Sequence, residues 1–499
     1  MSDFKKQHPV AAVSQVFETI KQNFVTLIIL FFIGTSNTEG YFLYFLAAGI
    51  GLSLFAGVFG WWVFRYRVKD DELQIRKGVF VKNNIYMSKD RIQVIDITEG
   101  LIQRLFGLVK VEIKTAGGGT ESATISAITR EEAEALRTEL RKKNGQVATE
   151  AEDGLADEQD EEEILDTWKL PNKDLVYAAF TSGNFGLIAS ILGAVSGQLN
   201  EVINEETIEY LYEILPGFNN VTMIITVVVA IIVVSWTLSF LGVIFNYSDF
   251  RLQKTKKELI ITSGLIERKH ITIPFDRIQA VRFVEGVIRQ PFGYGMVYVE
   301  SAGFNQTQKG RSIVIAPYLA ADAFSTFLSD FLPEYQEPEY EITPKPKVKF
   351  RYIRRPAYLI LLALPIVWFL LDYGWLLGLM LPLMGFLGWL RYRDAAIGIN
   401  EEYIRSRFRN ISRTTAISKR IRVQNVELSQ NPFQKRKQVY SLSTTVASGA
   451  GGMNFEVDDL NQNDCLLVYN WVAGNEHVTK PDDAVEEVTN SDQTESRFY

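Results

Sequence analysis

Residues 90–117 read DRIQVIDITEGLIQRLFGLVKVEIKTAG, and residues 276–303 read DRIQAVRFVEGVIRQPFGYGMVYVESAG. Without any gap, 12 of these 28 positions are identical. A fainter third copy, 145 residues further on, keeps four identities in 27 positions. Because self-similarity at a fixed spacing indicates a repeat architecture, we interpret the chain as three copies of one unit.

Each repeat has the pattern of a small β-rich domain that ends in a helix. Val109, Val111 and Ile113 alternate with charged residues, as expected for a strand with one buried face. Turns are predicted at Gly78, Gly264, 117–119 and 449–452. Closing helices are predicted over 130–143, with Thr129 and Glu132 spaced as a capping box, over 317–332, with Pro317 in the first position, and over 459–473.

Long uncharged runs precede the three β-rich stretches. Residues 41–64, 175–199 and 221–245 contain 24, 25 and 25 residues without a charge, enough for a membrane-spanning helix. Residues 22–38 form a shorter run, and 356–390 contain only one charge, Asp372. The last run fits two short helices joined at 372–374 or one long tilted helix. We expect six spans arranged as three hairpins.

The distribution of basic residues predicts the orientation of these hairpins. Loops 34–40, 200–220 and 372–374 contain no Lys or Arg, whereas every opposite flank is basic. Positive residues near span ends remain in the cytoplasm. Both termini and all the β-rich domains are therefore predicted to be cytoplasmic. The basic flanks would also suit anionic lipid head groups, although topology alone explains them.

These patterns predict an ordered series of segments, with two linkers of biased composition. Residues 150–166 hold ten Asp or Glu and no Lys or Arg, which favours disorder. The predicted segments are the N-terminus and hairpin 1 (1–64), domain 1 (65–143), an acidic disordered linker (144–170), hairpin 2 (171–245), domain 2 (246–332), a proline-rich linker (333–352), hairpin 3 (353–390), domain 3 (391–474) and a mobile tail (475–499).

Motifs for catalysis, metals or cofactors are missing from the sequence. The three histidines lie far apart, and no spacing of His, Cys and Asp fits a metal site. Cys465 is the single cysteine, so we expect a buried apolar side chain and no intramolecular disulfide. The net charge of −7 argues against a nucleic-acid partner. We expect no enzyme activity and no cofactor.

A hairpin followed by Glu72-Leu-Gln-Ile and Asp90-Arg-Ile-Gln, and again by Glu258-Leu-Ile-Ile and Asp276-Arg-Ile-Gln, resembles the bacterial pleckstrin-homology-like (PH-like) membrane proteins of the three-unit, YdbT type. The third copy departs from the pattern. Lys437–Gln438 stands where the others have Phe106–Gly107 and Phe292–Gly293, and Arg409 stands where they have Gly78 and Gly264.

The resemblance implies an α+β membrane protein in the bacterial cell membrane, with PH-like β-sandwiches or barrels, each capped by a C-terminal helix. It also implies a smaller single-domain PH-like membrane protein as partner, and a link to the cell envelope and to resistance against antimicrobial peptides. The family has no established catalytic residues.

Two functional readings remain open from the sequence. The first is a membrane scaffold whose domains bind protein partners or membrane lipids. A polar pair repeated in every unit offers a candidate binding face, although such residues often fix a turn or strand edge: Arg91, Gln93, Arg277, Gln279, Arg422 and Gln424. The second is an export or immunity transporter for a peptide or lipid, with a polar route past Thr181, Asn184 and Asp372.

Overall fold

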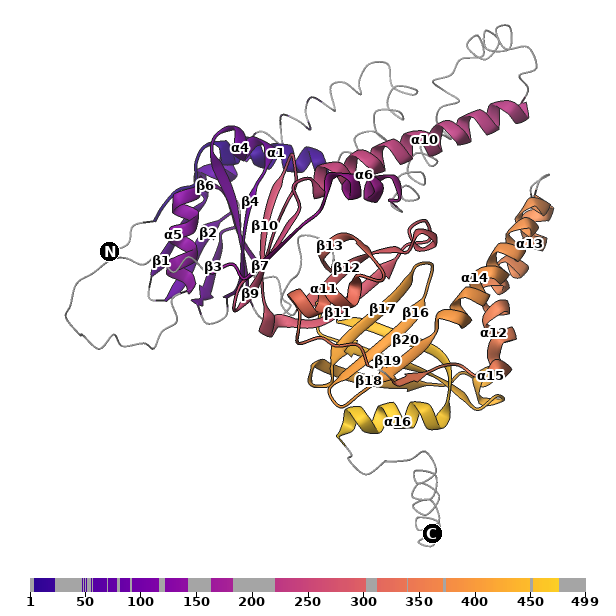
Figure 1. The fold of residues 1–499 in the computed structure, drawn as a ribbon. Helices are drawn as coiled ribbons and strands as arrows, with labels where there is room; N and C mark the ends of the chain where they lie inside the picture. Colours follow the sequence, from indigo (N-terminus) through magenta and orange to yellow (C-terminus); the bar gives the residue numbers. More distant parts are fainter. Residues whose placement is uncertain are drawn as a thin grey trace. The chain divides into compact units, whose positions relative to one another are not determined.

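The computed structural model describes residues 4–22, 57–69, 71–78, 81–89, 92–115, 122–141, 163–182, 220–301, 312–338, 340–370, 374–448 and 452–474, with a few isolated helical residues between 47 and 55. The chain divides into two compact units, residues 1–274 and 275–499. Helices and strands carry the labels of Figure 1.

The first repeat folds as a two-layer sandwich closed by a helix. Alternating apolar residues from both layers, such as Leu73, Met87 and Val111, form one core with Leu136 of the helix. The predicted strand alternation is confirmed, since Val109, Val111 and Ile113 are all buried. The elements are β1 (Arg65–Lys69), β2 (Glu72–Lys77), β3 (Asn83–Ser88), β4 (Ile92–Glu99), α4 (Leu101–Leu105), β5 (Leu108–Thr115), β6 (Ser122–Thr129) and α5 (Arg130–Arg141).

The closing helix of the first repeat begins where the sequence predicts. The backbone N–H of Glu132 donates to Thr129 Oγ1 over 3.2 Å, and the N–H of Thr129 points back at the Glu132 carboxylate over 3.4 Å. This reciprocal arrangement satisfies donors that the first turn of a helix leaves without intrahelical partners. The predicted capping box is therefore confirmed.

The second layer of the first repeat continues into strands of the second repeat. The resulting seven-stranded sheet has the order β6-β5-β4-β10-β9-β8-β7, with β4 and β10 paired antiparallel at the junction (Figure 1). Its strands from the second repeat are β7 (Asp166–Lys169), β8 (Arg251–Lys254), β9 (Glu258–Ser263) and β10 (Arg268–Pro274). The two repeats thus share backbone hydrogen bonds as well as a linker.

The second compact unit repeats this arrangement. Its seven-stranded sheet has the order β13-β12-β11-β17-β16-β15-β14, and a three-stranded sheet, β18-β19-β20, completes the third repeat with a closing helix. The elements are β11 (Ile278–Glu285), β12 (Tyr294–Ser301), β13 (Ile313–Ala320), α11 (Phe324–Phe331), β14 (Tyr340–Ile342), β15 (Ala396–Ile399), β16 (Tyr403–Arg409), β17 (Arg413–Lys419), β18 (Val423–Ser429), α15 (Pro432–Lys435), β19 (Val439–Val446), β20 (Met453–Asn461) and α16 (Gln462–Ala473).

Each hydrophobic segment leaves from and returns to the same sheet. In each case a residue or strand before the segment pairs with one after it. Lys5 forms a β-bridge with Tyr66 across the first segment, β7 pairs with β8 across the second, and β14 pairs with β15 across the third. The sequence prediction began each domain after its hairpin and so missed these leading strands. Asp166–Lys169 and Tyr340–Ile342, which we predicted as parts of linkers, form strands β7 and β14 because a partner strand satisfies their backbone groups.

Among the described residues, two helices are long and apolar enough to cross a membrane, Val229–Tyr247 and Pro346–Phe369. The predicted spans at 22–38, most of 41–64 and 183–199 lie outside the described residues. The helices next to these segments are α1 (Val10–Gln22), α6 (Asn172–Phe180), α10 (Asn220–Tyr247), α12 (Lys349–Arg354), α13 (Tyr358–Leu370) and α14 (Met380–Asp394).

The third hydrophobic run, residues 356–390, contains two helices and not one long tilted helix. Helix α13 ends at Leu370 and α14 begins at Met380 after a 3₁₀ segment, Gly374–Leu379. The chain turns back closely at Gly374, where an added Cβ would meet the carbonyl oxygen of Val367 at 2.2 Å. A Cβ added at Gly388 of α14 would likewise meet the carbonyl oxygen of Tyr352 in α12 at 2.3 Å, so this small residue allows α14 and α12 to pack tightly.

The predicted closing helix of the second repeat is wrong at its start. Pro317 does not begin a helix but lies within β13, and α11 begins at Phe324. Strand β13 is the edge of its sheet, and Pro317 falls at a register irregularity opposite Gly295–Val297. Proline lacks a backbone donor, so sheet edges and bulges tolerate it, and a helix start was only one of its two readings.

The departures of the third repeat are accommodated locally. Gln438 adopts a left-handed φ of 52°, close to the 66° and 74° of the matching Gly107 and Gly293. Arg409 needs no such conformation, because it pairs with Arg413 and extends the β16–β17 hairpin by one residue pair. The third copy therefore keeps the fold of the others with different residues at its turns.

Candidate functional site

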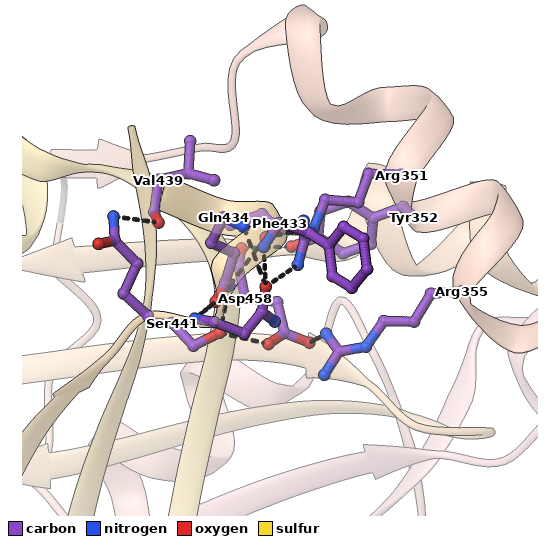
Figure 2. A network of polar contacts seen from close by, with 11 residues as sticks. Arg351, Tyr352, Arg355, Phe433, Gln434, Val439, Ser441 and Asp458 are labelled. Atoms are coloured by element: carbon purple, nitrogen blue, oxygen red, sulfur yellow. Dashed lines mark hydrogen bonds and ion pairs between the residues drawn. The ribbon is translucent and has the colours of Figure 1, made fainter. Parts of the chain in front are cut away.

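A network of polar contacts joins the third hydrophobic segment to the third repeat (Figure 2). Arg351 and Tyr352 lie on α12, and Arg355 follows directly. The Nε of Arg351 lies 2.9 Å from the Asp459 carboxylate, and its second nitrogen donates to Asn431 over 3.0 Å. Arg355 forms an ion pair with Asp458, and the Tyr352 hydroxyl donates to the Asp458 carbonyl.

Asp459 is the buried centre of this network. It is 1% exposed, and its φ of 54° lies in the left-handed region, which turns its carboxylate toward α12 and α15. Besides Arg351, the Gln434 side chain donates to this carboxylate over 2.9 Å. Burial raises the pKa of Asp459 above its usual value, because desolvation disfavours the charged form, while Gln434 and Arg351 act in the opposite direction.

The short helix α15 holds the other side of the network in place. Asn431 caps it by accepting from the backbone N–H of Gln434 over 2.9 Å, and the Gln434 side chain accepts in return from the Asn431 N–H. Gln434 also donates to Ser441 over 2.9 Å, and Ser441 donates to Asp458 over 2.6 Å. Tyr352 and Arg355 each bind only Asp458, but the other members each bind at least two partners, so the network fixes the base of α12 on strands β19 and β20.

A shallow cavity of about 150 Å³ opens beside the network, with Arg391, Arg409, Glu456 and Asp458 among its lining residues. Two of these charges, Arg409 and Asp458, are already held in ion pairs within the protein. Arg409 is buried, with Nε 2.5 Å from the Asp394 carboxylate, and Arg391 donates to the Asn410 carbonyl over 3.0 Å. Burial raises the pKa of Glu456. A lining of mixed charges, with two of them held in ion pairs, suits a structural joint better than an anion-binding pocket.

The candidate face predicted from the repeated polar pairs is only partly placed. Arg91 and the side chain of Gln93 lie outside the described residues. Gln279 is buried and donates to the carbonyl of Arg277 over 3.1 Å, so it supports its own turn. Arg422 donates to the Asp276 carbonyl over 2.8 Å, and Gln424 is exposed on β18. A shared binding face at these residues stays a prediction.

Sequence reasoning missed the Arg351–Asp459 network. Its members are 108 residues apart, and the strand registers make position 459 equivalent to Tyr318 of the second repeat and Ala127 of the first. Comparing the repeats therefore marks Asp459 as unusual in a buried strand, and this was the signal available. Its partner on α12 follows only from the three-dimensional path of the chain.

Catalytic chemistry finds no support in the described part of the chain. No group of three His, Cys, Asp or Glu that could hold a metal ion is found among those residues. Cys465 is buried, as predicted, and burial raises the pKa of its thiol to about 12. A thiol with such a pKa remains protonated at neutral pH, so it lacks the thiolate that a nucleophile requires.

Apolar side chains are exposed along the two candidate spans. In α10 these include Val229, Val233 and Leu238, and in α13 they include Leu362 and Phe369. Contiguous exposed apolar surface of this kind requires a partner or a membrane to cover it. In Figure 1, α10 extends beyond the sheet of its own unit, with no other labelled element along its distal half.

Comparison with known proteins shows the same three repeats. The profile of the Bacterial PH domain family matches residues 22–144, 204–331 and 357–476, so the divergent third copy is included. The chain is 33% identical over 487 residues to the UPF0699 transmembrane protein YdbT of Bacillus subtilis (strain 168), covering 94% of this chain and 98% of that protein. It is also 32% identical over 78 residues to the UPF0699 transmembrane protein YdbS of the same organism, covering 16% of this chain and 47% of YdbS.

Proposed function

This chain belongs to the bacterial PH domain family, and we propose that it is a non-enzymatic, multi-pass scaffold of the bacterial cell membrane. Three hairpins anchor it, and both termini and all three PH-like domains face the cytoplasm. The domains bind protein partners or lipid head groups, in service of cell-envelope integrity or resistance to antimicrobial peptides. A smaller PH-like membrane protein of the YdbS kind is one such partner.

One observation carries this proposal: the hydrophobic segments are inserted within the sheets and are not attached by a flexible linker. Strands β7 and β8 pair on either side of the second segment, and β14 and β15 on either side of the third. Two connections to one sheet hold a domain at a set height and orientation, where a single linker would leave it free to rotate. A scaffold needs such rigid presentation.

The base of the third hairpin is also suited to lipid head groups. Arg351 and Arg355 are paired with carboxylates, but Lys347, Lys349 and Arg354 are exposed beside Phe350, which is 74% exposed. Basic residues with an aromatic side chain at a membrane border attract anionic lipids, at about 1 kcal/mol for each charge. We assign the exposed side chains of Lys347, Lys349, Phe350 and Arg354 as the lipid-contacting surface of the third repeat.

Polar residues near the second hairpin serve packing, which favours a scaffold over a transporter. The hydroxyls of Ser182 and Ser239 lie 2.8 Å apart and are both buried, and Trp236 donates to the Phe180 carbonyl over 3.2 Å. Thr181, a candidate for a transport route, donates to the Tyr177 carbonyl within its own helix. Asn184 and Asp372 lie outside the described residues.

Orientation is tested by single-cysteine labelling in intact cells, which is clean because Cys465 is buried. A membrane-impermeant maleimide should label Asn204→Cys in the predicted outer loop. It should label Val81→Cys, at an 81% exposed turn position, only after the cells are permeabilised. Labelling of Val81→Cys in intact cells would overturn the cytoplasmic placement of the domains.

Lipid binding is tested by extracting the full chain in mild detergent and measuring the anionic lipid that co-purifies. Replacing Lys347, Lys349 and Arg354 with alanine should lower it at least tenfold, given about 1 kcal/mol for each charge. Lys257→Ala, an exposed lysine in the β8–β9 turn, is the matched control and should leave it unchanged. Equal lipid in both proteins would refute the lipid-contacting surface.

A further inference from the structure

The two junctions between repeats follow one pairing rule. At the first junction, Glu99 of β4 lies opposite Arg268 of β10. At the second, Glu285 of β11 lies opposite Arg413 of β17. Shifting by the repeat spacings of 186 and 145 residues converts the first pair into the second, so the antiparallel register is the same. At the second junction the Glu285 carboxylate forms a close ion pair with Arg413.

By this rule, the first and the third repeat each have one strand that could form a junction but has no partner strand in the described part of the chain. By the same spacings, β3 is the equivalent of β10 and β17 in the other repeats. Likewise, β18 is the equivalent of β4 and β11. Yet β3 and β18 are both outermost strands of three-stranded sheets, with no further strand paired to them in the part of the chain that the structure describes. Their exposure agrees: β11 is mostly buried, whereas Gln424, Asn425, Glu427 and Ser429 of β18 are exposed.

We propose that β18 of one chain pairs antiparallel with β3 of a second copy, in the register of the two internal junctions. Ser429 then lies opposite Asn83, and Glu427 opposite Ile85. The inference goes beyond the proposed function, because it concerns self-assembly and does not depend on what the domains bind.

A second copy is the occupant that the observations favour, since every chain carries both complementary edges. An exposed edge presents a row of backbone donors and acceptors, and adding a strand satisfies them. Both edges are short and polar, with Asn83 and Asn84 on β3, so the contact is reversible. Pairing β18 with β3 is a heterologous contact, and it extends a row of repeats from one copy to the next.

Disulfide trapping between two differently tagged full-length chains tests the contact directly. Directly opposite residues of an antiparallel pair have Cβ atoms about 4.5–5.5 Å apart, which an engineered disulfide can bridge after a small adjustment. Ser429→Cys in one chain and Asn83→Cys in the other are co-expressed, and membranes are oxidised mildly. We expect a mixed dimer carrying both tags, absent from chains with only the buried Cys465.

Two controls separate this register from random collision. Moving one cysteine by a single residue, to Asn84→Cys, points it to the opposite face and should lower the yield at least fivefold. Placing the other cysteine at Asn454, on the far edge strand β20 of the same sheet, should give no mixed dimer.

A charge exchange provides a readout that needs no crosslink. Ser429→Glu with Asn83→Glu should lower co-purification of the two tagged chains in mild detergent about two- to fivefold, and Ser429→Glu with Asn83→Lys should restore it. The proposal is overturned if Ser429→Cys crosslinks with itself, if it crosslinks only to a different protein, or if properly folded chains give no mixed dimer.

Discussion

Replacing Arg351 with methionine tests the joint between the third hairpin and its domain most directly. The substitution keeps much of the apolar stem but removes the guanidinium that lies 2.9 Å from the Asp459 carboxylate. That carboxylate is 1% exposed and would keep only the Gln434 side chain as a close donor. The variant therefore leaves a buried charge without its ionic partner.

The expected cost is large for a single substitution. Removing one member of a buried ion pair costs about 3–5 kcal/mol, and the remaining bond from Gln434 places this case near 3 kcal/mol. A change of that size increases the population of the opened third repeat about 100-fold.

The cost should also depend on pH. Burial raises the pKa of Asp459, and Arg351 opposes that rise, so the variant's carboxyl binds its proton more tightly in the folded state than in the unfolded state. Stability then falls as the pH rises from the unfolded pKa, roughly 4, through the folded one. The variant should lose more stability at pH 7.5 than at pH 5.

Thermolysin cleavage of the full chain in detergent micelles measures this opening. The rate should rise about 100-fold at pH 7.5 in Arg351→Met and clearly less at pH 5. Adding Asp459→Asn should recover part of the loss, because the amide removes the unpaired charge. Arg354→Met, an exposed neighbour on α12, is the matched control and should cleave like the wild type. Equal rates in Arg351→Met and the control would refute the reasoning.

Substitutions at four further positions test other parts of the fold. Arg409→Met leaves the buried Asp394 carboxylate without the nearest guanidinium, which should destabilise the fold by about 3–5 kcal/mol. We expect this loss of stability to reduce the monodisperse peak on size exclusion. Gly293→Ala should destabilise by about 1 kcal/mol in thermal unfolding, while Gln438→Gly, at the matching left-handed position, should stabilise by a similar amount. Cys465→Ser should cost about 1–3 kcal/mol, since the hydroxyl lacks the thiol's tolerance of burial, and Cys465→Ala at the same site provides the volume control.

Local features of the fold were predictable because they are encoded by short-range patterns. The alternation at Val109–Ile113, the Thr129 capping box and the turn glycines Gly78 and Gly264 all depend on residues close in sequence. The third closing helix was also placed within a few residues, since α16 begins at Gln462. The prediction of a helix start at Pro317 failed because proline is typical both of the first position of a helix and of an edge strand.

The shared sheets and the Arg351–Asp459 network could not be predicted in the same way. Pairing between β4 and β10 joins residues about 170 positions apart, and the sequence of neither strand indicates which strand it pairs with. Likewise, β7 and β14 are only four and three residues long and lie inside stretches whose composition favours linkers. Long-range pairing depends on the whole chain path, so these strands carried no local signal.

The shared sheets change how a domain deletion should be interpreted. Removing the third repeat would uncover β11, whose Val281, Phe283 and Glu285 are buried while β17 covers them. The shortened protein would then carry an unpaired, aggregation-prone strand edge at β11, and the Glu285 carboxylate would lose its ion pair with Arg413. Loss of function after such a deletion would therefore not identify a ligand-binding domain. Point substitutions of exposed residues such as Lys347, Lys349 and Arg354, which leave every strand paired, separate binding from folding.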